Sequence, residues 1–243
     1  MTFRRIIALG AAAALGGTAA TAQTPTSSQD VIPNTRTPPL SNVALADRAF
    51  RDLVGCVIRY QPDRTRNLLG TIPGTPEEGR ILHSFDSRME TCYDVFRTGR
   101  GALMYQDNLL RGFVAEAYYG RDFPAGISPA AGAAPELVAA WERPRPTGGA
   151  VTQIEMLHAM ARCVTARQPA AVGALLRTAP LSPEERAAIR PLQADLSACL
   201  DSGVQLGASR QSLRGLLAEA AFHYGQAQRV GFARAAETAA AAD

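Results

Sequence analysis

Lysine is absent from this chain of 243 residues, so all 25 of its basic residues are arginines. We interpret this bias as a product of base composition in the coding sequence, without a functional meaning. Aromatic residues are also scarce, at 6% of the chain. Strands favour aromatic and β-branched side chains, whereas the abundant Ala, Leu and Arg favour helices. The composition therefore predicts an all-α protein, and its 47% of hydrophobic residues is enough for a core.

Strong charge of either sign is missing too. The formal net charge is +3, and without Arg4 and Arg5 the chain has 23 basic residues against 22 acidic ones. A chain so close to neutrality lacks the basic surface that binding to phosphates requires. We therefore expect no nucleic-acid partner.

Recognisable catalytic and cofactor motifs are lacking as well. The sequence contains no nucleophile elbow, no phosphate-binding Gly-rich loop, no two-His zinc helix and no dinucleotide-binding turn. Its three histidines, His83, His158 and His223, are far apart in sequence and do not form close pairs with cysteines. We therefore predict no catalytic residue, no metal and no cofactor.

Long hydrophobic runs are limited to the start of the chain. Arg4 and Arg5 precede a short apolar stretch from Ile6 to Gly17, which is too short to span a membrane. Ala20-Thr21-Ala22 matches a small-residue cleavage site, so residues 1–22 are predicted to be a signal peptide. We expect a periplasmic or secreted protein that begins at Gln23, with the Sec and twin-arginine routes both open.

The cysteines show that the chain repeats itself. Cys56 and Cys92 are 36 residues apart, as are Cys163 and Cys199, and a shift of 107 residues superimposes the two pairs. Twelve of the 37 positions from Cys56 to Cys92 are then identical without a gap. With four residues deleted from the second copy, Leu-Arg-Gly and Ala-Glu-Ala also align at 110–117 and 213–220. This self-similarity indicates an internal duplication.

The duplication divides the chain into two predicted units of about four helices each. Thr-Pro-Glu-Glu and Ser-Pro-Glu-Glu at 75–78 and 182–185 are helix starts, with a cap, a Pro and acidic residues in the first turn. Thr152 and Glu155 predict a capping box, and Pro191 should kink or split a helix. The expected segments are a Pro/Ser/Thr-rich mobile tail at 23–40, the first unit at 41–122, a Pro/Gly/Ala-rich linker at 123–150, the second unit at 151–230 and an Ala-rich tail at 231–243.

Four cysteines allow three pairings. The duplication favours Cys56 with Cys92 and Cys163 with Cys199, because an ancestral single unit could pair only within itself. A catalytic thiol pair would need Cys-x-x-Cys spacing, which is absent. We therefore predict one structural disulfide in each unit, as an exported chain permits.

A few polar residues of the fourth helix occur in both units, and capping does not explain them. They are Arg111 and Glu116 in the first unit and Arg214 and Glu219 in the second. They could form a solvated face, a buried pair that holds the helix against its neighbours, or a groove that contacts a partner or ligand. Residues five apart on a helix cannot pair with each other on one face, so we expect each of these side chains to contact another helix of its own unit. Gly112 and Gly215 lie beside the arginines, and a Gly kept inside a helix suggests close backbone packing there.

The pattern Cys-Val, Gln-Pro, Leu-Leu, Pro-Glu-Glu, Cys, Leu-Arg-Gly and Ala-Glu-Ala, over residues 43–225, resembles uncharacterised exported helical-repeat proteins of Gram-negative alphaproteobacteria. The resemblance implies export and brings no activity, cofactor or partner. We therefore expect a non-enzymatic binding or structural module of the envelope. Its partner would be an envelope protein or a small ligand. An envelope enzyme with an unrecognised helical active site and a small-ligand carrier with a pocket between the units are the alternatives.

Overall fold

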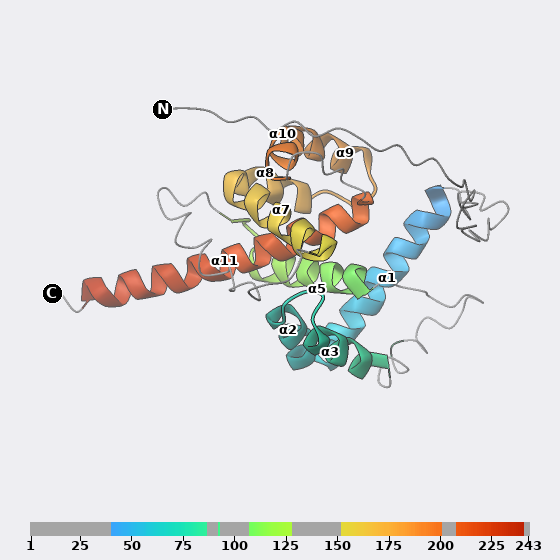
Figure 1. Ribbon diagram of the computed structural model, residues 1–243, viewed down its shortest axis with the longest axis horizontal. Coiled ribbons are helices and arrows are strands. Elements are labelled where there is room, and N and C mark those ends of the chain that lie inside the picture. Colours follow the sequence, from blue (N-terminus) through green and yellow to red (C-terminus); the bar gives the residue numbers. More distant parts are fainter. Residues whose placement is uncertain (1–39, 87–91, 93–106, 128–151, 201–207, 241–243) are drawn as a thin grey trace, which may run out of the picture. The chain divides into compact units, whose positions relative to one another are not determined.

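The computed structural model of the protein describes residues 40–86, 92, 107–127, 152–200 and 208–240, and Figure 1 shows their arrangement. Every regular element within these ranges is a helix, which confirms the all-α prediction. No helix in this part of the chain is both long and apolar enough to cross a membrane. The predicted signal peptide and the mobile tail up to residue 39 lie outside the described residues.

The first unit contains four described helices: α1 (Leu40–Tyr60), α2 (Pro62–Gly70), α3 (Pro76–Asp86) and α5 (Asp107–Asp122). Gln61 separates α1 from α2, because a residue before Pro is pushed out of the helical region and the Pro itself suits a first turn. The side chain of Thr75 accepts a hydrogen bond from the backbone N–H of Glu78 and so caps α3.

The second unit repeats this order with α7 (Gln153–Arg167), α8 (Pro169–Leu176), α9 (Pro183–Ile189), the 3-10 turn η1 (Arg190–Leu192), α10 (Gln193–Ala198) and α11 (Arg210–Ala240). Thr152 and Glu155 form the predicted capping box on α7. Ser182 caps α9, and the predicted break at Pro191 is the 3-10 turn between α9 and α10. A Pro in a helix interior removes a hydrogen bond and clashes with the preceding turn, which explains the break.

Helices α5 and α11 lie side by side at the centre of this arrangement, green and red in Figure 1. Helix α5 also packs against α1 and α2, while α11 packs against α7 and α8, so each central helix is covered by the matching pair of its own unit. The buried apolar side chains of both units belong to one continuous core. The two units are therefore joined along α5 and α11.

The segments between and beyond the units are described only in part. The ring of Phe123 contacts the rings of Tyr119 and Phe222, and Ile127 is buried. The start of the predicted 123–150 linker therefore packs on the core. Residues 128–151 lie outside the described residues. Helix α11 continues as far as Ala240, so the predicted Ala-rich tail is helical over most of its length.

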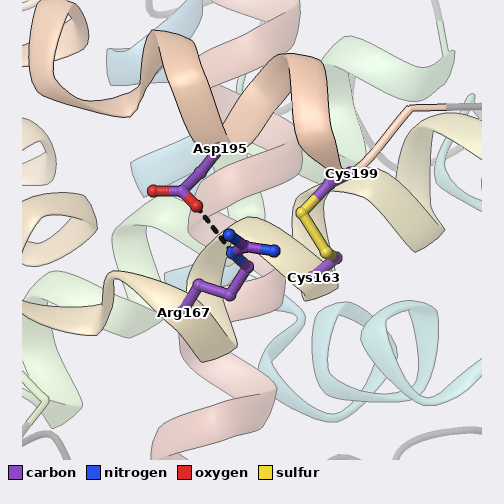
Figure 2. The surroundings of a disulfide bond; sticks show 4 residues. All are labelled: Cys163, Arg167, Asp195 and Cys199. Atoms are coloured by element: carbon purple, nitrogen blue, oxygen red, sulfur yellow. Dashed lines mark hydrogen bonds and ion pairs between the residues drawn. A yellow bond between two sulfur atoms is a disulfide. The ribbon is translucent and has the colours of Figure 1, made fainter.

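Both predicted disulfides are present, and each closes within its own unit. The Cα atoms are 5.8 Å apart in each bridge. Cys56 ties α1 to Cys92, and Cys163 ties α7 to the end of α10. Figure 2 shows the second bridge beside an ion pair between Arg167 and Asp195, which joins the same two helices at 2.6 Å. The second bridge and this ion pair therefore hold α7 and α10 together.

Replacing Cys163 and Cys199 together by Ser should lower the free energy of unfolding by about 4 kcal/mol. Removing the bridge frees a loop of 36 residues in the unfolded chain, and loop-closure entropy sets that value. Chemical denaturation of the oxidised protein and of the double variant measures the difference. Non-reducing peptide mapping should recover Cys56 with Cys92, and a peptide that joins Cys56 to Cys163 would contradict the pairing.

Candidate functional site

The two arginines that the units share are buried where α5 meets α11. Arg111 and Arg214 each expose only 2% of their surface and are the largest fully buried side chains in the part of the chain that the structure describes. A buried guanidinium is strongly destabilising unless carboxylates and hydrogen-bond acceptors surround it. The stability of this site therefore depends on the groups that pair with the two cations.

Arg111 reaches out of α5 into the turn that follows α2. Its Nη1 atom donates to the carbonyl of Leu68 at 2.7 Å and to Oγ1 of Thr71 at 2.9 Å, and its Nη2 atom donates to the carbonyl of Thr71 at 2.9 Å. The carboxylate of Glu78, on α3, lies 3.0 Å from Nη1. Helix α2 ends at Gly70, so its last carbonyls have no partner within the helix and can accept these bonds.

Arg214 makes the matching contacts in the second unit. It donates to the carbonyls of Leu175 at 3.0 Å and of Leu176 at 2.9 Å, to both oxygens of Thr178 and to Glu185 at 3.1 Å. The aligned residues of the first unit are the ones that hold Arg111. The identical Leu-Leu, Thr and Pro-Glu-Glu positions of the two units therefore include the lining of one arginine socket, which occurs twice.

The remaining carboxylates are exchanged between the units. Both oxygens of Glu219, on α11, accept from Arg111 at 2.6–2.8 Å, and Glu116, on α5, accepts from Arg214 at 2.8 Å. The expectation that these four residues pair within each unit is wrong for the two glutamates. Residues five apart on a helix point about 140° away from each other, so Glu116 cannot turn back to Arg111. Glu116 instead contacts Arg214, on the crossing helix α11.

This exchange depends on how closely the two central helices approach. A Cβ atom on Gly112 would lie 2.6 Å from the Cα atom of Gly215, and a Cβ atom on Gly215 would lie 2.9 Å from the Cα atom of Gly112. Real Cβ atoms do not come so close to backbone, so both positions require glycine. The close backbone packing that the sequence suggested is confirmed, and it occurs between the two glycines themselves.

Glu78 and Glu185 have a larger role than the sequence indicated. We expected both pairs of glutamates to serve the helix starts alone. Glu77 and Glu184 are indeed exposed, but Glu78 and Glu185 are buried. Besides its arginine, each accepts a hydrogen bond from a turn N–H, of Gly74 at 2.6 Å and of Leu181 at 2.8 Å. The only sequence signal for this role was their identity in both units.

Charge balance makes the network electrostatically stable. Burial on its own would raise the pKa of Glu219, but the guanidinium of Arg111 outweighs it and holds that pKa well below its ordinary value. Burial likewise opposes the charge of Arg111, whereas Glu219 and Glu78 raise the pKa of its guanidinium. Glu219 and Arg111 therefore stay charged across the physiological pH range.

Two histidines, which the sequence left unassigned, also approach this network. Nδ1 of His158 lies 3.7 Å and Nε2 of His223 lies 3.8 Å from Glu219. A metal could in principle use two imidazoles and a carboxylate, but the guanidinium of Arg111 already occupies both oxygens of Glu219. Among the described residues no group of three or more His, Cys, Asp or Glu side chains is arranged to hold a metal.

Replacing Glu219 by Ala should leave Arg111 buried with one carboxylate and lower the free energy of unfolding by about 3–5 kcal/mol. Glu116→Ala should cost less, because the side chain of Glu116 is 13% exposed and water can reach the vacated place. Chemical denaturation measures both. Glu77→Ala, at an exposed position, should change the value by less than about 0.5 kcal/mol. Equal effects for Glu219 and Glu77 would contradict the buried network.

Replacing Gly112 by Ala should destabilise the protein, although Ala is the better helix former by about 1 kcal/mol. The new methyl group would collide with the backbone of Gly215 and push α5 away from α11. Gly55 is the matched control, because it lies inside α1 and a Cβ atom there would meet nothing within 4 Å. Thermal melting should therefore show a lower Tm for Gly112→Ala and an unchanged or higher Tm for Gly55→Ala.

Comparison of the chain with protein-family models, with curated proteins and with solved structures finds no match. What the candidate site does must therefore be inferred from its own contacts. Those contacts place Arg111, Arg214 and Glu219 out of reach of a partner, and leave only an edge of Glu116 accessible.

Proposed function

We propose that this protein is an exported, non-enzymatic helical module that presents a rigid surface to a partner in the cell envelope. The proposal rests on the observation that the charged residues shared by the two units pair with one another in the interior. Arg111, Glu78 and Glu219, with their counterparts in the other unit, bind one another inside the protein. These shared ion pairs therefore support a structural role for the residues and not a role in catalysis.

Export is the second part of the proposal. Two disulfides are typical of proteins in oxidising compartments, where thiols are not kept reduced. The Arg4-Arg5 start, the short apolar stretch and the Ala20-Thr21-Ala22 site support removal of residues 1–22 and a periplasmic or secreted location. The resemblance to exported helical-repeat proteins of alphaproteobacteria agrees with this location.

An internal duplication is the third part. The socket around each arginine uses aligned residues, and the helices follow one another in matching order. A scaffold is favoured over a ligand carrier with a pocket between the units, because the backbones touch at Gly112 and Gly215 and leave no space for a ligand there. Partner contacts then belong on the outer helices.

Photo-crosslinking in the native host tests the proposal. A photoreactive residue replaces Leu45 or Tyr60, which are 62% and 64% exposed and point about 60° apart on the surface of α1. Mass spectrometry of the envelope fraction should find the mature chain starting at Gln23 and joined to one discrete envelope protein. The exposed Glu184, on α9 of the other unit, is the control position for random collisions.

Each part of the proposal can fail separately. A chain that keeps Met1 in the envelope fraction would contradict removal of a signal peptide. Correct processing without an adduct at Leu45 or Tyr60, or with the same adducts at Glu184, would contradict a specific contact through α1. A small-molecule adduct, or turnover of an envelope substrate by the purified protein, would instead favour the carrier or the enzyme.

A further inference from the structure

Two equivalent positions of the units differ in a way that the duplication does not explain. Arg51 on α1 and His158 on α7 are 107 residues apart, the same shift that aligns the cysteines. Nη1 of Arg51 lies 2.8 Å from Oε2 of Glu116, and Nδ1 of His158 lies 3.7 Å from Oε2 of Glu219. Each glutamate thus receives an arginine from the other unit and a second basic side chain from its own.

The chemical difference between these two side chains is large. Arg51 keeps its charge at every physiological pH, so the contact between α1 and α5 always joins a cation to Glu116. An imidazole changes its charge near neutrality, so the contact between α7 and α11 does not have a constant charge. The two units therefore respond differently to acid, although their backbones follow the same plan.

The surroundings of His158 oppose a positive charge there. The side chain is buried, and burial is the main cause that lowers its pKa. Arg111 on α5 and Arg162 on α7 lower the pKa further, whereas Glu219 on α11 and Glu78 on α3 raise it. His223 on α11 faces the same carboxylate of Glu219 from a partly exposed position. A proton on His158 would thus enter a buried cluster that already contains a charged arginine.

We propose that His158 makes the packing of α7 against α11 acid-sensitive, while Arg51 keeps the equivalent packing of α1 against α5 closed in acid. Protonated His158 needs solvation that the buried cluster does not provide, so α7 loosens from α11 below neutral pH. The Cys163–Cys199 bridge does not prevent this, because it ties α7 to the end of α10 and not to α11. The second unit would then expose a different surface in acid.

The sign of the pH dependence follows from the direction of the shift. Because the pKa of His158 is lower in the folded protein than in the unfolded chain, the unfolded state takes up the proton first as pH falls. Titration of His158 therefore leaves the free energy of unfolding unchanged above the ordinary histidine pKa of about 6.5. Below that pH the free energy of unfolding decreases, until the pH reaches the pKa of His158 in the folded protein. His223 also lies 3.8 Å from Glu219, so the test is made in a background without that side chain.

The test compares melting at pH 7.5 and pH 5.5, a window above the titration of ordinary carboxylates. In a His223→Gln background, Tm should fall in acid by at most about 3–5 °C, because pH 5.5 lies about one unit below the ordinary histidine pKa. His158→Gln should remove that fall. The difference between the two pH values is the readout, so a uniform loss of stability in a variant does not affect it.

Amide hydrogen exchange at pH 5.5 locates the effect. Compared with His158→Gln at the same pH, the parent protein should exchange faster in α7, while α1 exchanges equally in both. An equal fall of Tm with and without His158, or faster exchange spread evenly over both units, would overturn the proposal. If His158→Gln folds poorly, His158→Asn is a second variant without a titratable group and should also abolish the acid response.

Discussion

The structure depends on the need to satisfy two buried arginines at the point where α5 and α11 touch. Gly112 and Gly215 allow the two backbones to meet, and Arg111 and Arg214 then lie too deep for water to solvate them. Each cation must find carboxylates inside the protein, since an unpaired buried charge would cost several kcal/mol. The turns after α2 and α8, the starts of α3 and α9 and the crossing helix supply what each arginine needs. These elements are consequently held in one arrangement.

The exchange of Glu116 and Glu219 makes the two units interdependent. In a twofold-symmetric interface, residue i of one partner meets residue j of the other, and j meets i in return. Arg111 with Glu219 and Arg214 with Glu116 follow this rule within a single chain. Disulfides and apolar packing hold each unit together, whereas the charge exchange also fixes how α5 and α11 cross. A change at either glutamate therefore affects both units.

Matching architecture does not make the units chemically identical. Glu116 is paired with Arg51 and retains some exposure, whereas Glu219 is fully enclosed and faces His158 and His223. The second unit thus contains a buried imidazole, whose pKa burial lowers, in a place where the first unit has a permanent charge.

The sequence by itself determined the features that depend on neighbouring residues or covalent spacing. The helical class, the capped starts at Thr152 and Ser182, the break at Pro191 and the pairing of the cysteines all follow from such signals. The sequence also singled out Arg111, Glu116 and their counterparts, but placed their contacts within each unit. Only the tertiary structure decided that Glu219 binds Arg111, that Glu78 completes the socket and that His158 faces the same carboxylate as His223. The reason is physical: the packing of helices brings together partners that are 33 to 108 residues apart in the sequence, and no local pattern encodes which side chains meet there.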